Sequence, residues 1–336
     1  MIPATSIEAQ APDWRRQWRD AIDDPRALLR LLDLDRLADT VLDLPRDRFP
    51  LRVPQSFVAR MRRGDANDPL LRQVLPIIDE QWQQPGFSID AVGDLSSRAG
   101  AGVLHKYQGR ALLVTTGSCA VHCRYCFRRH FPYAEETAAR DRWRSALDTL
   151  RADTSIHEVL LSGGDPLALG TARLRELTDA LAELPHIRRL RIHTRLPIVL
   201  PARIDSELTD WLSTLPWPVA VVVHANHANE INDEVHASMR RLRASGVSLL
   251  NQSVLLRGVN DSVDALADLS ESLFDVGVLP YYLHLLDRVE GAAHFDVSDT
   301  DAAVLERGLR ARLPGYLMPR WVREIAGEAS KTPFIA

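Results

Sequence analysis

The chain has 336 residues, of which 46% are hydrophobic and 26% charged, and its formal net charge is −4. This ordinary globular composition excludes collagen-like, low-complexity and disordered chains, and the length accommodates one large domain and a smaller one. The mild acidity predicts no nucleic-acid partner, and the apolar runs are far shorter than the roughly 18 residues of a membrane span.

The N-terminal part of the chain predicts helices joined by polar connections. Residues 1–20 lack the hydrophobic segment of a signal peptide, so we expect a cytoplasmic location without membrane association. Leucines spaced three and four apart, behind an Asp-Pro start, predict an amphipathic helix over 23–44. Shorter helices are expected in 54–64 and 68–82, before a turn at Gln84–Gly86.

From about residue 111 the pattern changes to short runs of β-branched residues and leucine, which recur at intervals of roughly 30 residues with helical segments between them. This rhythm predicts an α/β fold, a partial (β/α)6 barrel of the TIM type. We expect a helical region in 1–95, the barrel in 96–300, and a C-terminal helix and tail in 301–336. The six predicted strands are Ala111–Thr116, Glu158–Ser162, Leu190–Thr194, Val219–Ala225, Val247–Val254 and Tyr281–Leu286.

Polar residues follow the predicted strands, at the ends that form the active site in such barrels. Asp165 is among them, and we expect it to cap the helix that follows. The full set is Cys119, Gly163–Asp165, His193, His224, Gln252 and Asp287.

The strongest chemical signal is the motif Cys119-Ala-Val-His-Cys123-Arg-Tyr-Cys126, which holds all three cysteines of the chain. An odd number of clustered cysteines argues against a disulfide framework and for metal binding or redox chemistry. Three thiolates on one loop can ligate three irons of a [4Fe–4S] cluster and leave the fourth iron open to an external ligand. The alternative is a structural zinc site that adds His122 or His130.

The second signal is the scarcity of lysine. Of the 41 basic residues, 39 are arginine, and only Lys106 and Lys331 are lysine. A Schiff base with pyridoxal phosphate (PLP) requires a primary amine, which arginine cannot supply. Lys331 is therefore a candidate for binding PLP, against the ordinary alternative of an exposed lysine near the C-terminus.

The cysteine motif, with Tyr125 as its aromatic residue, and the turn Ser162-Gly-Gly-Asp165-Pro resemble those of the radical S-adenosylmethionine (SAM) superfamily. Longer blocks resemble the lysine 2,3-aminomutase family within it, and in particular its short type, which serves the β-lysylation of elongation factor P (EF-P). These blocks cover roughly residues 68–336 and include CRYCFRRHFPY, LSGGDPL, RIHTRLPIVLPARI, HANHANE and REIAGEASKTP.

The resemblance implies three cofactors: a [4Fe–4S] cluster, SAM and PLP. Lys331 matches the lysine that binds PLP, in a C-terminal PLP-lysine tail. The cluster ligands would be Cys119, Cys123 and Cys126, and the open iron would bind SAM. Further cofactor-lining positions are Gly163, Gly164, His224 and Gln252 for SAM, and Lys106, Tyr107 and Arg110 for PLP and SAM; His284 stands where longer members carry tyrosine.

The resemblance also implies the substrate. Arg128 matches the arginine that binds a carboxylate, and Asp287 and Glu324 match the two acids that bind the ε-ammonium group of L-lysine. Glu324 stands where longer members carry aspartate, and it keeps the charge. The implied activity is that of an isomerase, an L-lysine 2,3-aminomutase that converts (S)-α-lysine to (R)-β-lysine by radical chemistry. Arginine is an electrostatically acceptable substrate too.

The short type further implies a partner ligase that transfers β-lysine to a lysine of EF-P. Longer members continue past the PLP lysine into an arm with zinc-binding cysteines that helps subunits associate, whereas this sequence has five residues after Lys331. The oligomeric state is therefore left open. The alternatives are an arginine 2,3-aminomutase, a PLP-independent radical SAM enzyme, and a non-enzymatic iron–sulfur or zinc scaffold.

Overall fold

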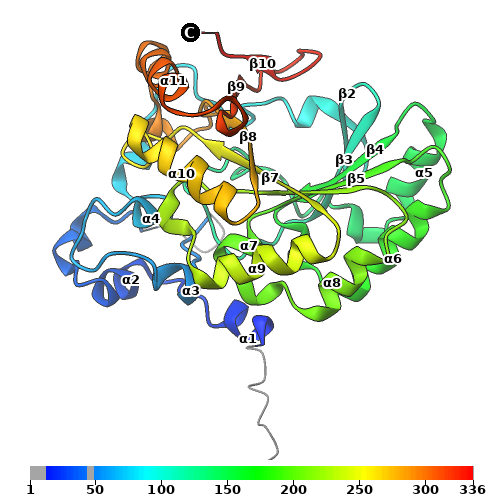
Figure 1. Cartoon of the computed structure of the whole chain (residues 1–336), viewed down its shortest axis with the longest axis horizontal. Coiled ribbons are helices and arrows are strands. Elements are labelled where there is room, and N and C mark those ends of the chain that lie inside the picture. The colour runs from blue at the N-terminus through cyan, green and yellow to red at the C-terminus, as the bar shows by residue number, and fades with distance from the viewer. Residues whose placement is uncertain (1–12, 44–48, 336) are drawn as a thin grey trace, which may run out of the picture.

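The computed structural model describes residues 13–43 and 49–335. Its centre is a sheet of ten strands that follow one another in chain order, and no ladder among the described residues joins the first strand to the last. The predicted partial barrel is therefore confirmed as an open α/β sheet (Figure 1). The strands are β1 (Arg98–Gly100), β2 (Val103–Tyr107), β3 (Arg110–Thr116), β4 (Glu158–Gly163), β5 (Arg189–Thr194), β6 (Val219–Val223), β7 (Ser248–Val254), β8 (Leu279–His284), β9 (Arg320–Arg323) and β10 (Thr332–Pro333).

The strands from β3 to β9 pair in parallel, and a helix follows each strand from β3 to β8. These are the six expected β/α units. Figure 1 shows α5, α6, α8 and α9 in succession along the outside of the sheet. The helices are α5 (Arg144–Ala152), α6 (Thr171–Ala182), α8 (Ser206–Ser213), α9 (Asp233–Ala244), α10 (Val263–Asp275) and α11 (Asp299–Arg312), with the short α7 (Leu196–Val199) before α8.

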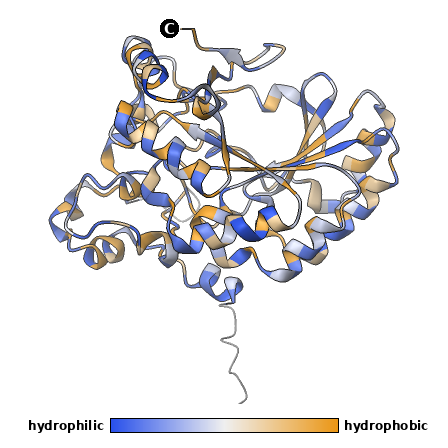
Figure 2. Cartoon of the chain, in the orientation of Figure 1, coloured by the Kyte–Doolittle hydropathy of each residue, from blue (hydrophilic) through white to orange (hydrophobic). Residues whose placement is uncertain are grey.

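The sequence determines these elements locally. Helix α9 begins where the Asn232 side chain accepts a hydrogen bond from the Val235 amide, and it buries Val235, Met239 and Leu242 at helical spacing. Strand β6, which lies inside the sheet, is apolar throughout, as expected of a strand covered on both faces. Figure 2 shows that the outer helices carry both hydrophobic and hydrophilic segments.

The N-terminal part contains short helices rather than long ones. The helix expected over 23–44 is wrong: α2 (Pro25–Leu31) ends before Asp33, whose φ is +58°, and a 3-10 helix, η1 (Asp35–Thr40), follows. A left-handed residue cannot continue an α-helix. The end of that window, at Leu44, lies outside the described residues.

The two other helices predicted in this part are also shorter than expected. The window 54–64 holds α3 (Gln55–Val58). The window 68–82 holds α4 (Pro69–Arg72) and a second 3-10 helix, η2 (Ile78–Gln81), with Pro76 between them. The helix is interrupted here because proline disfavours the helical conformation of the residue before it. The remaining helix here is α1 (Trp14–Arg19).

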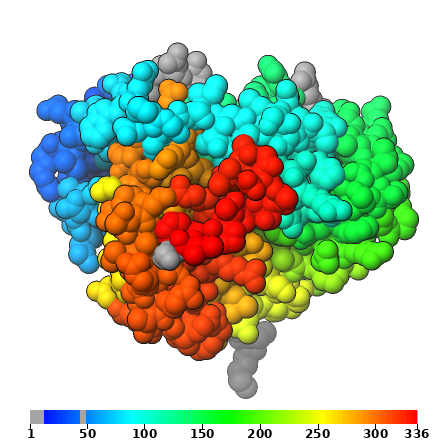
Figure 3. Space-filling view, turned by 90° about the horizontal axis from the view of Figure 1, so that it is seen from above, coloured from blue at the N-terminus to red at the C-terminus, as the bar shows by residue number. Residues whose placement is uncertain are grey.

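Four strands were not predicted: β1 and β2 at one edge of the sheet and β9 and β10 at the other. Strand β9 places Trp321 and Val322 between two arginines, which is too short a run to show a period. It continues the parallel sheet beyond β8 and brings the C-terminal tail back onto the barrel. Figure 3 shows this red tail lying across one face, between cyan and orange segments that are distant in sequence.

No helix within residues 13–43 and 49–335 combines the length and the hydrophobicity needed to cross a bilayer. The prediction about a signal peptide concerns residues 1–20, of which the first 12 lie outside the described part of the chain.

Candidate active site

The three cysteines lie on the loop that follows β3, and all three side chains are partly buried. Burial and the neighbouring Cys123 raise the pKa of the Cys126 thiol to about 11. Burial raises the pKa of Cys119 as well, and the charges of Cys126, Asp165 and Cys123 add to the shift. Three thiols this close together disfavour one another's ionised form, and bound iron cations would relieve that repulsion.

A segment of the N-terminal part holds this loop in place. The guanidinium of Arg124 donates to both carboxylate oxygens of Glu80, and one of those oxygens also accepts from Arg129 at 2.5 Å. Glu80 and Arg124 are both buried. His122 donates its amide to Arg52 O at 2.9 Å, and its ring stacks on Phe49 with centroids 4.7 Å apart. The loop is therefore fixed from outside the barrel.

The two histidines of the zinc alternative are engaged elsewhere. His122 Nδ1 lies 2.8 Å from Pro50 O, and His130 Nε2 lies 3.2 Å from Glu290 O. Within the described part of the chain, no three His, Cys, Asp or Glu side chains converge as the ligands of a single metal ion would.

The two glycines after β4 have a packing role that the sequence did not reveal. Gly163 has φ +120°, and a Cβ there would lie 2.6 Å from Thr116 O. A Cβ on Gly164 would lie 2.5 Å from Ser118 O. Both positions require glycine because the turn passes directly against the backbone that leads into the cysteine loop.

Asp165 caps the short 3-10 helix that follows it, as predicted, by accepting from the Leu167 amide at 3.0 Å. The same carboxylate accepts from Thr194 Oγ1 at 2.7 Å and from the Arg195 amide at 2.7 Å. The aspartate therefore joins the turn after β4 to the segment after β5, and burial raises its pKa.

Arg195, for which no role was predicted, reaches the cysteine loop. Its Nη1 lies 2.6 Å from Cys123 Sγ, and its Nη2 donates to Gln73 Oε1 at 2.7 Å and to Glu230 Oε2 at 3.0 Å. Gln73 and Glu230 are fully buried.

Lys331 lies in an ionic cluster at the C-terminal tail. Its Nζ pairs with Glu324 and stands 5.9 Å from the centroid of the Tyr282 ring. Glu324 also accepts from Tyr107 Oη at 2.7 Å and lies 3.5 Å from Lys106 Nζ. Although burial opposes ionisation, Lys331 and these donors lower the pKa of Glu324 to about 2. The structure thus brings together four of the predicted residues.

Asp94, which was not among the predicted residues, extends this ionic cluster to Arg128. Its Oδ1 lies 2.6 Å from Lys106 Nζ, and its Oδ2 accepts from Arg128 Nε at 2.6 Å. Arg128 Nη1 donates to Ser162 Oγ at 3.0 Å. Arg128 and Asp94 are both buried, and the two cations outweigh burial and lower the pKa of Asp94.

Asp287 lies near the same tail. Burial raises the pKa of this carboxyl to about 7, although the charge of Lys331 acts against the shift. The negative charge of Glu324 adds to it. The two predicted acids therefore differ. Glu324 is firmly ionised, whereas Asp287 is only partly ionised at neutral pH, and a second ammonium group nearby would ionise it more fully.

Three imidazoles present buried Nε2 atoms that have no hydrogen-bond partner in the described structure: His193, His224 and His284. His193 and His224 pack edge to face with centroids 5.7 Å apart, and burial lowers the pKa of all three rings. Unpartnered buried nitrogens are rare and fit a site that receives a polar ligand.

Two predicted residues stand apart from these contacts. Gln252 lies on β7, buried, beside Tyr282 in the sheet register. Arg110 stacks on Tyr107, with its guanidinium carbon 4.7 Å from the ring centroid. Within residues 13–43 and 49–335 neither side chain forms a hydrogen bond or ion pair with Lys331, so their predicted roles rest on the resemblance.

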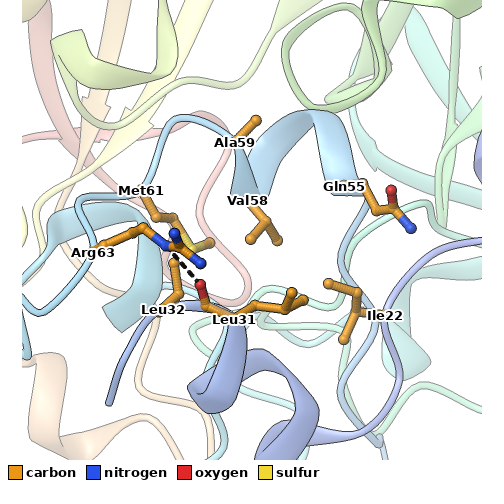
Figure 4. A pocket seen from close by; sticks show the side chains of 8 residues that line it. All are labelled: Ile22, Leu31, Leu32, Gln55, Val58, Ala59, Met61 and Arg63. Carbon is orange, nitrogen blue, oxygen red and sulfur yellow. Dashed lines mark hydrogen bonds between the residues drawn. The ribbon is translucent and has the colours of Figure 1, made fainter.

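A cavity of about 330 Å³ lies elsewhere, beside α2 and α3 in the N-terminal part (Figure 4). Its lining contains none of the predicted site residues and is apolar except for two side chains, and Arg63 Nε donates to Leu31 O at 3.0 Å. The lining residues are Ile22, Leu31, Leu32, Gln55, Val58, Ala59, Met61 and Arg63. It holds no group suited to acid–base or nucleophilic chemistry.

Comparison with known proteins identifies the class of this site. The Radical SAM superfamily profile matches residues 113–269, which span β3 to α10. Together with the open sheet and the cysteine loop, this match identifies a radical SAM domain in residues 113–269, and this superfamily implies a [4Fe–4S] cluster and SAM as cofactors.

Closer relatives define the family. The L-lysine 2,3-aminomutase of Escherichia coli (strain K12) is 50% identical over 322 residues, which cover 96% of this chain and 94% of that protein. The protein of the same name from Haemophilus influenzae is 44% identical, with 99% and 98% covered. That from Clostridium subterminale is 32% identical, and the match covers 97% of this chain and 78% of that protein. The chain belongs to the L-lysine 2,3-aminomutase family, a family of isomerases, as the sequence analysis predicted.

Proposed function

We propose that this enzyme converts (S)-α-lysine to (R)-β-lysine with the help of PLP bound to Lys331, and that a partner ligase attaches the product to EF-P. The observation that carries the proposal is the 50% identity, over nearly the whole chain, to a protein named L-lysine 2,3-aminomutase. The EF-P branch is favoured because identity is higher to relatives that the chain spans almost completely than to the longer Clostridium protein.

The charges of the site support a long cationic amino acid as substrate. Arg128 stands at one end of the ionic cluster, and Glu324 stands at the other with Asp287 near it. Arg128 would bind the carboxylate, and the two acids would bind the ε-ammonium group. Lys106 and Asp94, which pair with each other, neutralise the space between the two ends.

The residues would also hold the cofactors. The three cysteines fit the iron cluster, and the unpartnered nitrogens of His193, His224 and His284 fit polar groups of SAM or PLP. When bound, the reduced cluster and SAM supply an organic radical that removes hydrogen from the substrate β-carbon, and PLP supplies the ring that carries the migrating nitrogen. Lys331 offers the primary amine for PLP, and Tyr107 and Lys106 keep Glu324 ionised and oriented when Lys331 leaves it.

The direct test is product analysis. The cluster is reconstituted anaerobically, PLP, SAM and a reductant are added, and L-lysine or L-arginine is supplied in parallel reactions. We expect β-lysine from lysine and no β-arginine. Formation of β-arginine without β-lysine would overturn the substrate assignment. Adding the ligase and unmodified EF-P then tests the second half of the proposal, because the mass of EF-P must rise by one β-lysyl group.

A further inference from the structure

The guanidinium of Arg195 is the one positive group that the described structure places in hydrogen-bond contact with a cluster ligand. Its Nη1 lies 2.6 Å from Cys123 Sγ. The arginine is 7% exposed, so water screens this contact little.

The side chain is held in this position from several directions. Its amide donates to Asp165 Oδ2 at 2.7 Å, and its Nη2 bonds to Gln73 and Glu230. The rings of Phe57 and Tyr125 lie 5.4 and 5.7 Å from its guanidinium carbon. Such a side chain cannot swing away to bind a substrate, and its orientation toward Cys123 is built into the fold.

Hydrogen bonds to ligand sulfurs and the charge around a cluster set its reduction potential. We propose that Arg195 raises the reduction potential of the [4Fe–4S] cluster through Cys123, and that Glu230 lowers it by neutralising part of the same guanidinium charge. Reduction adds one electron, from an external one-electron donor, to the cluster. The added negative charge is stabilised by the cation beside Cys123 and destabilised by the buried carboxylate behind it.

The pairing of Arg195 with Glu230 balances two requirements on the reduction potential of the cluster. A cluster of higher potential accepts its electron from a weaker donor, but it then has less driving force to pass that electron to SAM. The positive charge of Arg195 beside Cys123 and the negative charge of Glu230 behind it act in opposite directions, and together they set a reduction potential that meets both requirements. The inference rests on the cluster that the superfamily implies and not on the identity of the substrate, so it can be tested without lysine or PLP.

The test is a redox titration of the anaerobically reconstituted protein with dithionite and mediators, followed by electron paramagnetic resonance of the reduced cluster. In Arg195→Gln we expect the ratio of reduced to oxidised cluster to fall about tenfold at the wild-type midpoint, which equals a shift of about 59 mV for one electron. In Glu230→Gln we expect the ratio to rise. Iron and sulfide analysis must show that each variant holds a full cluster.

Arg203→Gln is the matched control. Arg203 is buried too, and its hydrogen bonds within the described structure go to Leu167, Leu169 and Thr171. Its midpoint should equal that of the wild type. A structural role for Arg195 and Glu230 would move both of their variants in one direction or cost both the cluster, whereas the proposal requires opposite signs.

The proposal is overturned if Arg195→Gln and Glu230→Gln keep the wild-type midpoint, or if both shift in the same direction. Should Arg195→Gln fail to hold the cluster, Glu230→Gln still decides, because it retains Arg195 and its midpoint must rise. Failure of this test leaves the lysine 2,3-aminomutase proposal intact, since β-lysine formation is measured separately.

Discussion

The chain holds its charged side chains in two different ways at the two ends of the site. Around the cysteine loop, Glu80, Arg124 and Glu230 have side chains that are at most 1% exposed. At the tail, Lys331, Lys106 and Glu324 are 21%, 17% and 12% exposed. The first group is sealed inside the protein, whereas the second can be reached by a ligand.

The two arrangements suit different tasks. A buried charge that loses its partner is expensive, so the ions around the cysteine loop fix one geometry permanently. In the tail one carboxylate, Glu324, is shared by Lys331, Lys106 and Tyr107, so one partner can leave while the others remain. In the proposed reaction an iron–sulfur cluster must stay in place over many turnovers, whereas the substrate amine must bind and leave.

Replacing Lys331 by arginine tests the exchangeable region most severely. Arginine keeps a positive charge beside Glu324 but cannot bind PLP through an imine, so we expect β-lysine formation to fall about a thousandfold or more. Product chromatography measures the rate, and the absorbance of bound PLP reports attachment. Substantial turnover in this variant would show that PLP is not attached through Lys331.

Replacing Glu80 by glutamine tests the sealed region. Arg124 and Arg129 would be left buried without their carboxylate, and we expect a loss of about 3 kcal/mol in the free energy of unfolding. Urea denaturation of the reconstituted protein measures it. The control is Glu176→Gln, which breaks an exposed pair with Arg173 and should cost at most about 0.5 kcal/mol. An equal loss of unfolding free energy in the two variants would contradict the structural importance of the buried ions around the cysteine loop.

Replacing Asp94 by asparagine tests the link between the two regions. Arg128 would lose the ionised partner of its Nε, and about 1.5 kcal/mol of charge-assisted hydrogen bonding would disappear. We expect the KM for lysine to rise about tenfold and the unfolding midpoint to change less than in Glu80→Gln. Steady-state kinetics at saturating SAM give the value. An unchanged KM would mean that Arg128 is oriented without Asp94.

The pH dependence of lysine binding tests Asp287. Its pKa of about 7 means that the carboxyl is protonated on the acid side of neutrality, where it cannot pair with an ammonium group. Lysine affinity should therefore be constant above this pH and fall about tenfold per unit below it. Equilibrium binding across neutral pH shows the profile, and Asp287→Asn should bind weakly with no such step. A step that persists in Asp287→Asn belongs to another group.

The repeating part of the fold was predictable, because the strands from β3 to β8 show a clear hydrophobic pattern and are separated by amphipathic helices. Strands β9 and β10 were not predictable, since they have only four and two residues. The long N-terminal helix was predicted wrongly because leucine spacing does not reveal the left-handed turn at Asp33.

Within the site, scarcity made some residues visible. Three cysteines and two lysines stand out in this composition. Arg195 is one of 39 arginines, and only its contact with Cys123 distinguishes it. Asp94 acquires its importance from Lys106 and from Arg128, 34 residues away. Contacts between residues distant in sequence depend on the tertiary fold, and a single sequence does not display them.

The pairing of Lys331 with Glu324 has one more consequence. While this amine is held by the carboxylate it is not available to a coenzyme, and the carboxylate is not available to a second amine. When Lys331 moves away from Glu324, the amine and the carboxylate both become available. In the proposed reaction the tail would therefore impose an order of loading, because the aldehyde of PLP that binds Lys331 would free Glu324 for the lysine that enters after it.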